Sequence, residues 1–269
     1  MRVAYQGVPG AYSEAAVMQR WGNAAEPLPK PYLEDVFSVV EAGEAEAGLV
    51  PVENTIEGSI TRTYDLLNEW SLTILGETVF RVSHCLIALP GVKPSDVKRV
   101  YSHPQALGQT RAYLAAHSYV PVNHFDTAGA VKMIHDEGHQ DAAAVASRRA
   151  AEIYGMNVLA EGIEDNLENF TRFLHIGRGS MKPTGRDKTS IAFTVDHKPG
   201  TLIAAMRALA DRHLNLTKIE SRPYAGRPWE YIFFIDFEGH GEDPVSAEAL
   251  RELAAYAGSL KVLGSYPRA

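Results

Sequence analysis

Five short polar clusters contain the residues of this sequence that could do chemistry. Each follows a stretch that reads as a strand, and together they cover residues 7–13 (GVPGAYS), 50–58 (VPVENTIEG), 102–109 (SHPQALGQ), 126–130 (DTAGA) and 169–173 (NFTRF). Serine, threonine, asparagine and glutamine side chains donate hydrogen bonds, and an arginine such as Arg172 can hold a carboxylate through two parallel bonds. The clusters therefore suit an anionic ligand and a chemistry that depends on hydrogen bonds, helix starts and at most one proton donor.

Each cluster also has an explanation in which it serves the structure alone. Ser13 and Ser102 could cap helices, Gly58 and Gly129 could form turns, and Thr171 could fill a strand. Spacing alone favours this explanation for every single cluster. Their shared position favours a common site, because loops at strand ends in α/β folds converge on one crevice.

Three other motifs predict no site. Gly7-Val-Pro-Gly10 lacks the third glycine and the Gly-Lys-Ser/Thr end of nucleotide-binding loops. His135 and His139 would share a helix face, but Gly138 is expected to end that helix, which favours a solvated helix end over zinc. The single cysteine, Cys85, lies in an apolar run and reads as a buried side chain. We therefore predict no metal, no disulfide and no cofactor.

Composition narrows the class of protein. The chain has 269 residues, 45% apolar and 22% charged, with a net charge of −7, which is ordinary for a globular protein of two domains. Nucleic-acid binding is not expected because Lys and Arg form no cluster. The apolar runs are too short to span a bilayer, and residues 1–7 read as a strand and not as a signal peptide. The cytoplasm is the expected location.

Predicted strands and helices alternate over the first 180 residues, and they must position the polar clusters. We expect helices at residues 13–21, 33–40, 60–67, 104–117, 127–135 and 148–155. We expect strands at residues 2–6, 48–52, 99–102, 119–125 and 142–147, with two more between 72 and 89 that break near Gly76. Strands that alternate with helices predict βαβ units and largely parallel sheets.

A stretch without hydrophobic periodicity separates the C-terminal part from the first 180 residues. Residues 177–188 are rich in Gly, Pro and charge, and read as a linker. After it we expect a half-buried strand at 191–195, a helix at 202–209, strands at 214–224 and 231–237 joined near 226–229, a helix at 250–257 and a strand at 260–266. This β-α-β-β-α-β order predicts a ferredoxin-like domain.

The polar clusters resemble those of the prephenate dehydratases, and the resemblance extends over nearly the whole chain. The matching stretches are residues 7–13, 50–55, 102–107 with Gln109, 126–128 and 171–173, and the C-terminal part resembles the ACT regulatory domain at residues 200–203 and 220–223. Small departures occur at Ala11-Tyr12, where the family has Thr-Phe, and at Thr201, where it has Ala. The second departure bears on the affinity for the effector.

The resemblance implies an architecture and an activity. It implies a two-lobed α/β catalytic domain at residues 1–180, similar to periplasmic binding proteins, a ferredoxin-like ACT domain at residues 188–269, and a homodimer or homotetramer. The family converts prephenate to phenylpyruvate, water and CO2 in phenylalanine biosynthesis, and phenylalanine regulates it. Thr171 is then the donor to the departing hydroxyl, and Glu53 is an alternative proton source.

The implied site residues form three groups. The catalytic group is Thr171, Arg172, Glu53, Asn54, Ser102 and Gln109. The substrate-binding group is Ser13, Thr55, His103, Thr127, Ala128 and Phe173. The group that binds phenylalanine is Gly200, Leu202, Asn215, Leu216, Glu220, Ser221, Arg222 and Pro223.

Two alternatives stay open on the sequence. Arogenate dehydratase would act on a substrate with an amino group in place of the keto group of prephenate, and no residue decides between them. A catalytically silent amino-acid sensor would have the same two-part fold, but the intact Thr171-Arg-Phe173 argues against it. No chorismate mutase helix precedes residue 1, so we expect a monofunctional enzyme.

Overall fold

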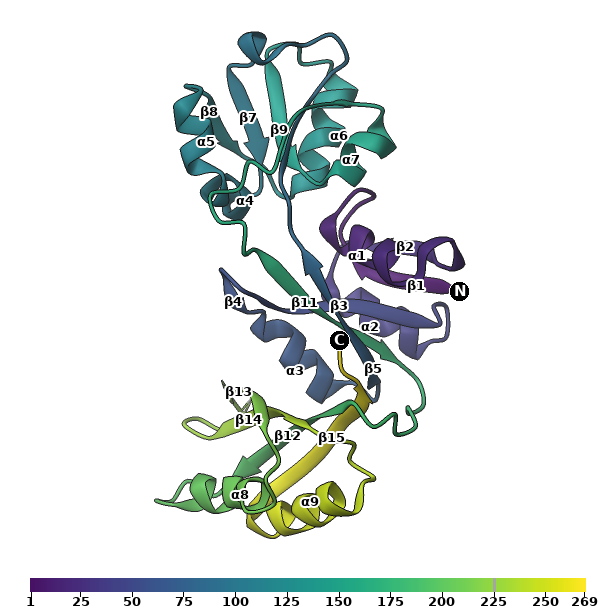
Figure 1. Cartoon of the computed structure of the whole chain (residues 1–269), viewed down its shortest axis with the longest axis vertical. Coiled ribbons are helices and arrows are strands. Elements are labelled where there is room, and N and C mark those ends of the chain that lie inside the picture. Colours follow the sequence, from purple (N-terminus) through teal and green to yellow (C-terminus); the bar gives the residue numbers. More distant parts are fainter. Residues whose placement is uncertain (225) are drawn as a thin grey trace. The chain divides into compact units, whose positions relative to one another are not determined.

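The computed structural model describes residues 1–224 and 226–269 and divides into two compact units (Figure 1). The first unit holds residues 1–36, 53–58 and 79–172, and the second holds residues 37–52, 59–78 and 173–269. Three strands continue from one unit into the other, namely β3 (Ala47–Asn54), β5 (Thr73–Arg81) and β11 (Phe170–Gly177). Among the described residues, no helix combines the length and the apolar character that crossing a bilayer requires.

The first unit begins with a parallel pair of strands, β1 (Arg2–Gln6) and β2 (Glu26–Lys30), joined through α1 (Tyr12–Trp21) and a 3-10 turn at Gly22–Ala24. Strand β2 was not predicted because Pro27 and Pro29 break the strand pattern. Proline has no N–H to donate and is confined to edge strands, and β2 stands at the end of its sheet. The prolines are therefore compatible with this position.

The rest of the first unit is a five-stranded α/β sheet in the order β10-β6-β9-β7-β8. Its strands are β6 (Cys85–Ala88), β7 (Arg99–Ser102), β8 (Val120–Asn123), β9 (Ala142–Ala146) and β10 (Asn157–Glu161). β7 pairs in parallel with β8 and β9, whereas β6 runs antiparallel to β9 and β10. The predicted parallel βαβ arrangement is confirmed for β7, β8 and β9.

Helices cover both faces of this sheet. They are α4 (Pro104–Gln109), α5 (Arg111–Ala116), α6 (Thr127–Glu137) and α7 (Arg148–Tyr154), and a 3-10 turn lies at Pro94–Asp96. The central strand β9 is fully buried, with Ala144 in one apolar cluster and Val145 in the other. The single helix predicted at 104–117 is wrong, because Thr110 leaves helical geometry (φ −121°, ψ 17°) and separates α4 from α5. α6 ends at Gly138, as expected.

The second unit contains the ferredoxin-like domain. Its elements are β12 (Asp187–Val195), α8 (Thr201–Ala210), β13 (Leu216–Pro223), β14 (Tyr231–Glu238), α9 (Pro244–Tyr256) and β15 (Ala257–Pro267). The strands form an antiparallel sheet in the order β13-β14-β12-β15. The predicted β-α-β-β-α-β order is confirmed.

Both faces of this sheet are covered, so the prediction of a half-buried first strand is wrong. Ile191 and Phe193 on β12 pack in one apolar cluster with α8 and α9. On the other face lies α3 (Thr61–Glu69), whose Tyr64 ring centroid is 5.2 Å from that of Phe234. The second unit also holds β4 (Gly58–Ser59) in part and most of α2 (Leu33–Glu41).

Gly76 does not break the strand that contains it. β5 runs without interruption from Thr73 to Arg81, and the break before β6 falls at residues 82–84. An added Cβ at Gly76 would come within 2.8 Å of Nδ1 of His175. The glycine therefore allows close packing within a continuous strand, and the prediction of a break at this position is wrong.

Candidate active site

Thr171 and Asn54 form the centre of the candidate site. Nδ2 of Asn54 donates to Oγ1 of Thr171 at 3.0 Å, to the Phe170 carbonyl at 3.2 Å and to Oδ1 of Asn169 at 2.8 Å. The Thr171 side chain is almost completely buried. Two of the predicted catalytic residues are thus in direct contact, although 117 positions separate them.

The loop of residues 54–58 is shaped by the same asparagine. Oδ1 of Asn54 accepts hydrogen bonds from the backbone N–H groups of Ile56 (2.9 Å) and Glu57 (3.0 Å). Asparagine side chains commonly fold a turn in this way. Thr55 contributes further, because its Oγ1 donates to the Glu168 carbonyl (2.6 Å) and accepts from the Phe170 N–H (2.9 Å).

The hydrogen bonds continue from Asn169 to Gln109, a predicted catalytic residue, and from there to His84 and Tyr12, which the sequence analysis did not assign to a site group. Nδ2 of Asn169 donates to Oε1 of Gln109 at 3.0 Å, and Nε2 of His84 lies 2.9 Å from the same oxygen. Nδ1 of His84 lies 2.6 Å from the hydroxyl of Tyr12. We call Thr171, Asn54, Asn169, Gln109, His84 and Tyr12 the Thr171 network.

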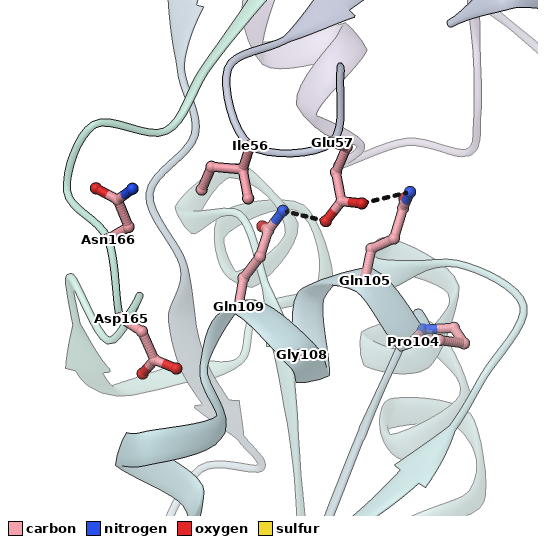
Figure 2. A pocket seen from close by; sticks show the side chains of 8 residues that line it. All are labelled: Ile56, Glu57, Pro104, Gln105, Gly108, Gln109, Asp165 and Asn166. Carbon is pink, nitrogen blue, oxygen red and sulfur yellow. Dashed lines mark hydrogen bonds between the residues drawn. The ribbon is translucent and has the colours of Figure 1, made fainter. Parts of the chain in front are cut away.

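A pocket of about 520 Å³ lies in the first unit (Figure 2). Its lining consists of Ile56, Glu57, Pro104, Gln105, Gly108, Gln109, Asp165 and Asn166. Two side-chain amides point at the carboxylate of Glu57, with Nε2 of Gln109 at 3.1 Å and Nε2 of Gln105 at 3.5 Å. The volume suits a small molecule, and the two amide groups are donors that suit a carboxylate.

Glu53 and Arg172 lie on the faces of their strands opposite the Asn54–Thr171 contact. Successive strand residues point to opposite faces, so Glu53 points away from Asn54 on β3, and Arg172 points away from Thr171 on β11. Both side chains are half-buried. This placement suits a role for Arg172 in the wall beside Thr171 better than one at the reacting centre.

Ser102 and Phe173 are buried side chains. Oγ of Ser102 is fully buried at the end of β7 and donates to the Val145 carbonyl at 2.6 Å, so its hydrogen is used within the sheet. Phe173 is 2% exposed in the part of β11 that belongs to the second unit. The alternative that Ser102 caps a helix is wrong, since His103 caps α4 through Nδ1, which accepts from the Gln105 N–H at 3.3 Å.

Three predicted substrate-binding residues lie in the first turns of helices. Thr127 and Ala128 begin α6, which Asp126 caps by accepting a hydrogen bond from Gly129. Ser13 lies in the first turn of α1 and does not cap it, because Ala11 occupies the capping position without a side-chain bond.

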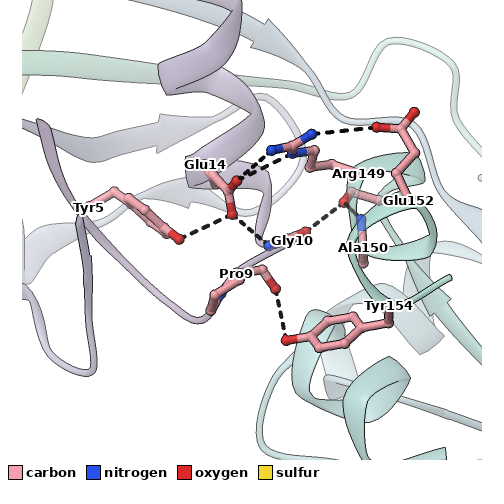
Figure 3. A network of polar contacts seen from close by, with 9 residues as sticks. Tyr5, Pro9, Gly10, Glu14, Arg149, Ala150, Glu152 and Tyr154 are labelled. Atoms are coloured by element: carbon pink, nitrogen blue, oxygen red, sulfur yellow. Dashed lines mark hydrogen bonds and ion pairs between the residues drawn. The ribbon is translucent and has the colours of Figure 1, made fainter. Parts of the chain in front are cut away.

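The loop of residues 7–10 contacts α7 and the segment before it (Figure 3). Glu14, which is 4% exposed, accepts hydrogen bonds from the Gly10 N–H (2.7 Å), the Tyr5 hydroxyl (3.1 Å) and the guanidinium of Arg149 (3.2 Å twice). The Gly10 carbonyl accepts from Oγ of Ser147 at 2.6 Å. A Cβ at Gly10 would lie 2.7 Å from Cα of Ala150, so only glycine fits this contact.

The predicted effector residues occupy two places in the ferredoxin-like domain. Gly200 precedes α8 with φ 86°, and Leu202 lines a pocket of about 140 Å³ with Thr201, Tyr231 and Phe233 among its other residues. Asn215, Leu216, Ser221 and Pro223 lie on or next to β13, where Ser221 and Pro223 are exposed.

The side chain of Arg222 is directed at α3, and that of Glu220 is directed at Ser59, two residues before α3. Oε2 of Glu220 accepts from Oγ of Ser59 at 2.5 Å, and Arg222 binds the carboxylate of Asp65 through Nε and Nη2. β13 alternates between half-buried and exposed residues, and these two belong to the half-buried set.

The described residues hold no group of three His, Cys, Asp or Glu side chains that could bind a metal ion. Cys85 is buried, as predicted. The fold and the candidate site define an α/β protein in which hydroxyl and amide side chains meet beside a pocket, with a ferredoxin-like domain at its C-terminal end.

Comparison with known proteins identifies the family. The family model described as "Prephenate dehydratase" matches residues 3–181, and the model described as "ACT domain" matches residues 189–255. "Arogenate dehydratase/prephenate dehydratase 2, chloroplastic" of Arabidopsis thaliana is 45% identical over 99% of this chain and 73% of that protein. The chain belongs to the prephenate dehydratase family and is a carbon–oxygen lyase with an ACT domain.

Two solved structures cover all of this chain. The prephenate dehydratase of Arthrobacter aurescens in complex with L-Phe has a TM-score of 0.92 and 35% identity, and 90% of its chain is covered. A structure described as GqqA, a novel type of quorum quenching acylase, has a TM-score of 0.94 and 36% identity, and 98% of its chain is covered.

Proposed function

We propose that this enzyme converts prephenate to phenylpyruvate, water and CO2, with Thr171 as the group that assists departure of the ring hydroxyl. Residues 1–180 form the catalytic domain, and residues 188–269 form the regulatory domain. The observation that carries the assignment of Thr171 is its hydrogen bond from Asn54, formed inside the region that matches the family model.

The reaction requires one proton and no oxidant. The bond between the ring and its carboxylate breaks, and the electron pair moves into the ring as CO2 leaves. The C–O bond to the ring hydroxyl then breaks at the far side of the ring. Hydroxide is a poor leaving group, so a proton or a strong hydrogen bond must reach this oxygen, and such assistance typically contributes about 10²–10⁴-fold to the rate.

The contact with Asn54 makes the Thr171 hydroxyl a better donor. The amide of Asn54 uses a lone pair of Oγ1 and leaves the hydroxyl hydrogen able to donate. A hydroxyl that accepts one hydrogen bond donates the next more strongly, and burial strengthens both bonds. A threonine hydroxyl is a weak acid, so it acts late, when the departing oxygen has become basic.

The substrate carboxylate that remains in the product is the one to bind firmly. Tight binding of the carboxylate that becomes CO2 would stabilise the ground state and raise the barrier. We assign Gln109, with Gln105 beside it in the pocket, to the carboxylate that stays, because their amide groups already bind the carboxylate of Glu57. His103, Thr127 and Ala128 belong to the surrounding helix starts.

Phenylalanine is the proposed effector. A relative that is 35% identical was solved in complex with L-Phe. Gly200 and Leu202 beside the small pocket, with the exposed residues of β13, form the proposed effector site, and the enzyme works as a homodimer or homotetramer. The effector changes activity only if it binds two states of the enzyme unequally.

The test is the rate of phenylpyruvate formation from prephenate by four purified proteins. The unaltered enzyme and Thr171→Ser should be active, whereas Thr171→Ala should lose about 10²–10⁴-fold in kcat. Thr189→Ala removes a fully buried threonine from the ACT sheet and is the matched control, with turnover kept. Turnover of Thr171→Ala close to that of the unaltered enzyme would contradict the role of Thr171.

Arogenate is the second candidate substrate. The chemistry at the ring is the same, and the Arabidopsis relative carries both names. Comparison of kcat/KM for the two compounds decides between them. The acylase description of one structural relative is a weaker guide. Acyl transfer requires a base that takes the proton of a nucleophile, and Thr171 instead accepts a hydrogen bond from an amide that cannot take a proton.

We place the enzyme in the cytoplasm. This proposal rests on the single cysteine of the sequence, which can form no disulfide within the chain. Fractionation of cells that make the tagged protein tests it.

A further inference from the structure

His84 is a buried residue with a defined partner on each side of its ring. It lies in the short segment between β5 and β6 and is 2% exposed. The hydroxyl of Tyr12 is 2.6 Å from Nδ1, and Oε1 of Gln109 is 2.9 Å from Nε2. The backbone N–H of His84 donates separately to Oε2 of Glu164 at 2.8 Å.

The orientation of the three side-chain amides in the Thr171 network follows from the backbone. Oδ1 of Asn54 accepts from two backbone N–H groups, so its Nδ2 must be the atom that donates to Oδ1 of Asn169. Nδ2 of Asn169 then donates to Oε1 of Gln109. Because this end of Gln109 is the oxygen, its NH2 group is the end that faces Glu57 in the pocket.

The same reasoning identifies the donor atom of the His84 ring. The oxygen of Gln109 cannot donate, so Nε2 of His84 carries a hydrogen and donates to it. Nδ1 is then the acceptor in the neutral ring, and the hydroxyl of Tyr12 donates to it at 2.6 Å, which is closer than the Ser83 carbonyl at 3.3 Å. Burial lowers the pKa of His84, although the contact with Gln109 and the charge of Glu164 act in the opposite direction, so the neutral ring is favoured.

We infer that His84 is a positioning residue that holds the side-chain amide of Gln109 with its NH2 group toward the substrate pocket. A glutamine amide can rotate by 180°, which would exchange a donor for an acceptor at the pocket. An oxygen in that position would repel a substrate carboxylate. Two donors on Oε1, from His84 and Asn169, stabilise the orientation that binds an anion.

Two substitutions of His84 distinguish a role in orienting Gln109 from a role in packing alone. In His84→Gln the side-chain amide reaches the place of Nε2 and can still donate to Gln109. In His84→Asn the amide reaches only the place of Nδ1. Both variants keep the backbone bond to Glu164, which does not involve the ring. A purely structural role would make both variants similar in activity once thermal unfolding shows that they are folded.

We expect His84→Asn to lose about 10–100-fold in kcat/KM, mainly as a higher KM, because a hydrogen bond to a charged group is weakened in the bound substrate and the transition state alike. His84→Gln should recover most of this loss. The matched control is His240→Asn in the ACT domain, another histidine that is 2% exposed and bonded to a backbone carbonyl, with KM unchanged.

The effect must pass through Gln109. His84→Asn combined with Gln109→Ala should therefore be no worse than Gln109→Ala alone, because contacts in one network are not additive. Additive losses, or equal KM values for His84→Asn and the unaltered enzyme, would overturn the inference.

The inference rests on the proposed function for its kinetic part, so a second measurement tests the geometry itself. In the ¹⁵N spectrum of the unaltered protein, the ring of His84 should show a protonated Nε2 and an unprotonated Nδ1. The two hydrogens of the Gln109 amide should give separate, sharp signals that broaden or shift in His84→Asn and return in His84→Gln. The opposite tautomer would overturn the inference even in an active enzyme. Inactivity toward both prephenate and arogenate with the expected spectra would overturn only the proposed function.

Discussion

The guanidinium of Arg222 holds the carboxylate of Asp65 through two hydrogen bonds, 3.1 Å from Nε and 2.8 Å from Nη2. Arg222 lies on β13 of the ACT domain, within the stretch predicted to sense phenylalanine. Asp65 lies on α3, the helix that follows the loop of residues 54–58. Lys218 and Glu220 contact Ser59, which lies two residues before the same helix. A displacement of β13 would therefore act directly on α3.

Asp65→Asn should weaken the response to phenylalanine and leave the rate without phenylalanine nearly unchanged. The substitution removes one charge of the pair, and both side chains are about one quarter exposed, so we expect roughly a 3–10-fold shift in the half-effective phenylalanine concentration. The measurement is a titration of activity with phenylalanine. Glu69→Gln on the same helix breaks an exposed pair with Arg62 and is the control. An identical response in both variants would refute the coupling through Asp65.

Asn54→Asp distinguishes the two roles of the Asn54 side chain, which are to donate to Thr171 and to fold the loop of residues 54–58. The carboxylate keeps the oxygen that accepts from Ile56 and Glu57, so the loop should persist. The carboxylate cannot donate to Thr171, and its second oxygen would face the partial negative charge on Oδ1 of Asn169. We expect kcat to fall by about 10²-fold, with thermal unfolding changed little. Asn54→Ala should lose both the loop and the rate. If Asn54→Asp kept its rate, the donation to Thr171 would have no catalytic role.

Glu57→Ala should lower KM several-fold. The Glu57 carboxylate occupies the amide groups of Gln105 and Gln109, which a substrate carboxylate must otherwise take from it (Figure 2). Glu168→Ala removes an exposed negative charge from the neighbouring segment and controls for the change in net charge. Steady-state kinetics at fixed ionic strength make the comparison. Equal KM changes in the two variants would show that charge alone matters.

Stability should fall above about pH 10, in part because of Tyr5. Burial and then the carboxylate of Glu14 raise the pKa of Tyr5, and burial raises the pKa of Tyr12. The unfolded chain loses these protons near pH 10 while the folded protein keeps them, so unfolding becomes easier as pH rises. Each tyrosine contributes up to about 1.4 kcal/mol per pH unit to the slope of the free energy of unfolding.

Tyr5→Phe should make this slope shallower in urea unfolding between pH 8 and pH 11. Tyr32→Phe, at a position that is 61% exposed, should leave the slope as it is. The explanation fails when the Tyr5 and Tyr32 variants have the same slope.

The sequence predicted most elements because their periodicity is local. The spacing of apolar residues was enough to predict the β-α-β-β-α-β order of the ACT domain. Apolar residues alternate in its strands and recur every three to four positions in its helices. The errors arose from tertiary context. Gly76 read as a break, although it allows close packing against His175, and Thr110 divides a helix that the apolar spacing predicted to be continuous.

The candidate site was predicted only in part, for a related reason. Thr171, Asn54 and Gln109 came from the family resemblance, and the structure brings them into one network. His84 was hidden inside an apolar run, where a histidine reads as part of the core. Its proposed role depends on Gln109 and Tyr12, which lie 25 and 72 positions away, and no spacing rule connects them.

The buried ion pair of Lys188 and Glu77 limits how the ACT domain can be removed or exchanged. Nζ of Lys188 lies 2.9 Å from both carboxylate oxygens, and the two side chains are only 10% and 3% exposed. Lys188 lies on β12, the first strand of the ACT domain, whereas Glu77 lies on β5, within the region that matches the prephenate dehydratase model. A buried charge that loses its partner typically destabilises a protein by about 3–5 kcal/mol. The ACT domain therefore cannot be removed or exchanged without a redesign of β5, because its removal would take away Lys188 and with it the charge that balances Glu77.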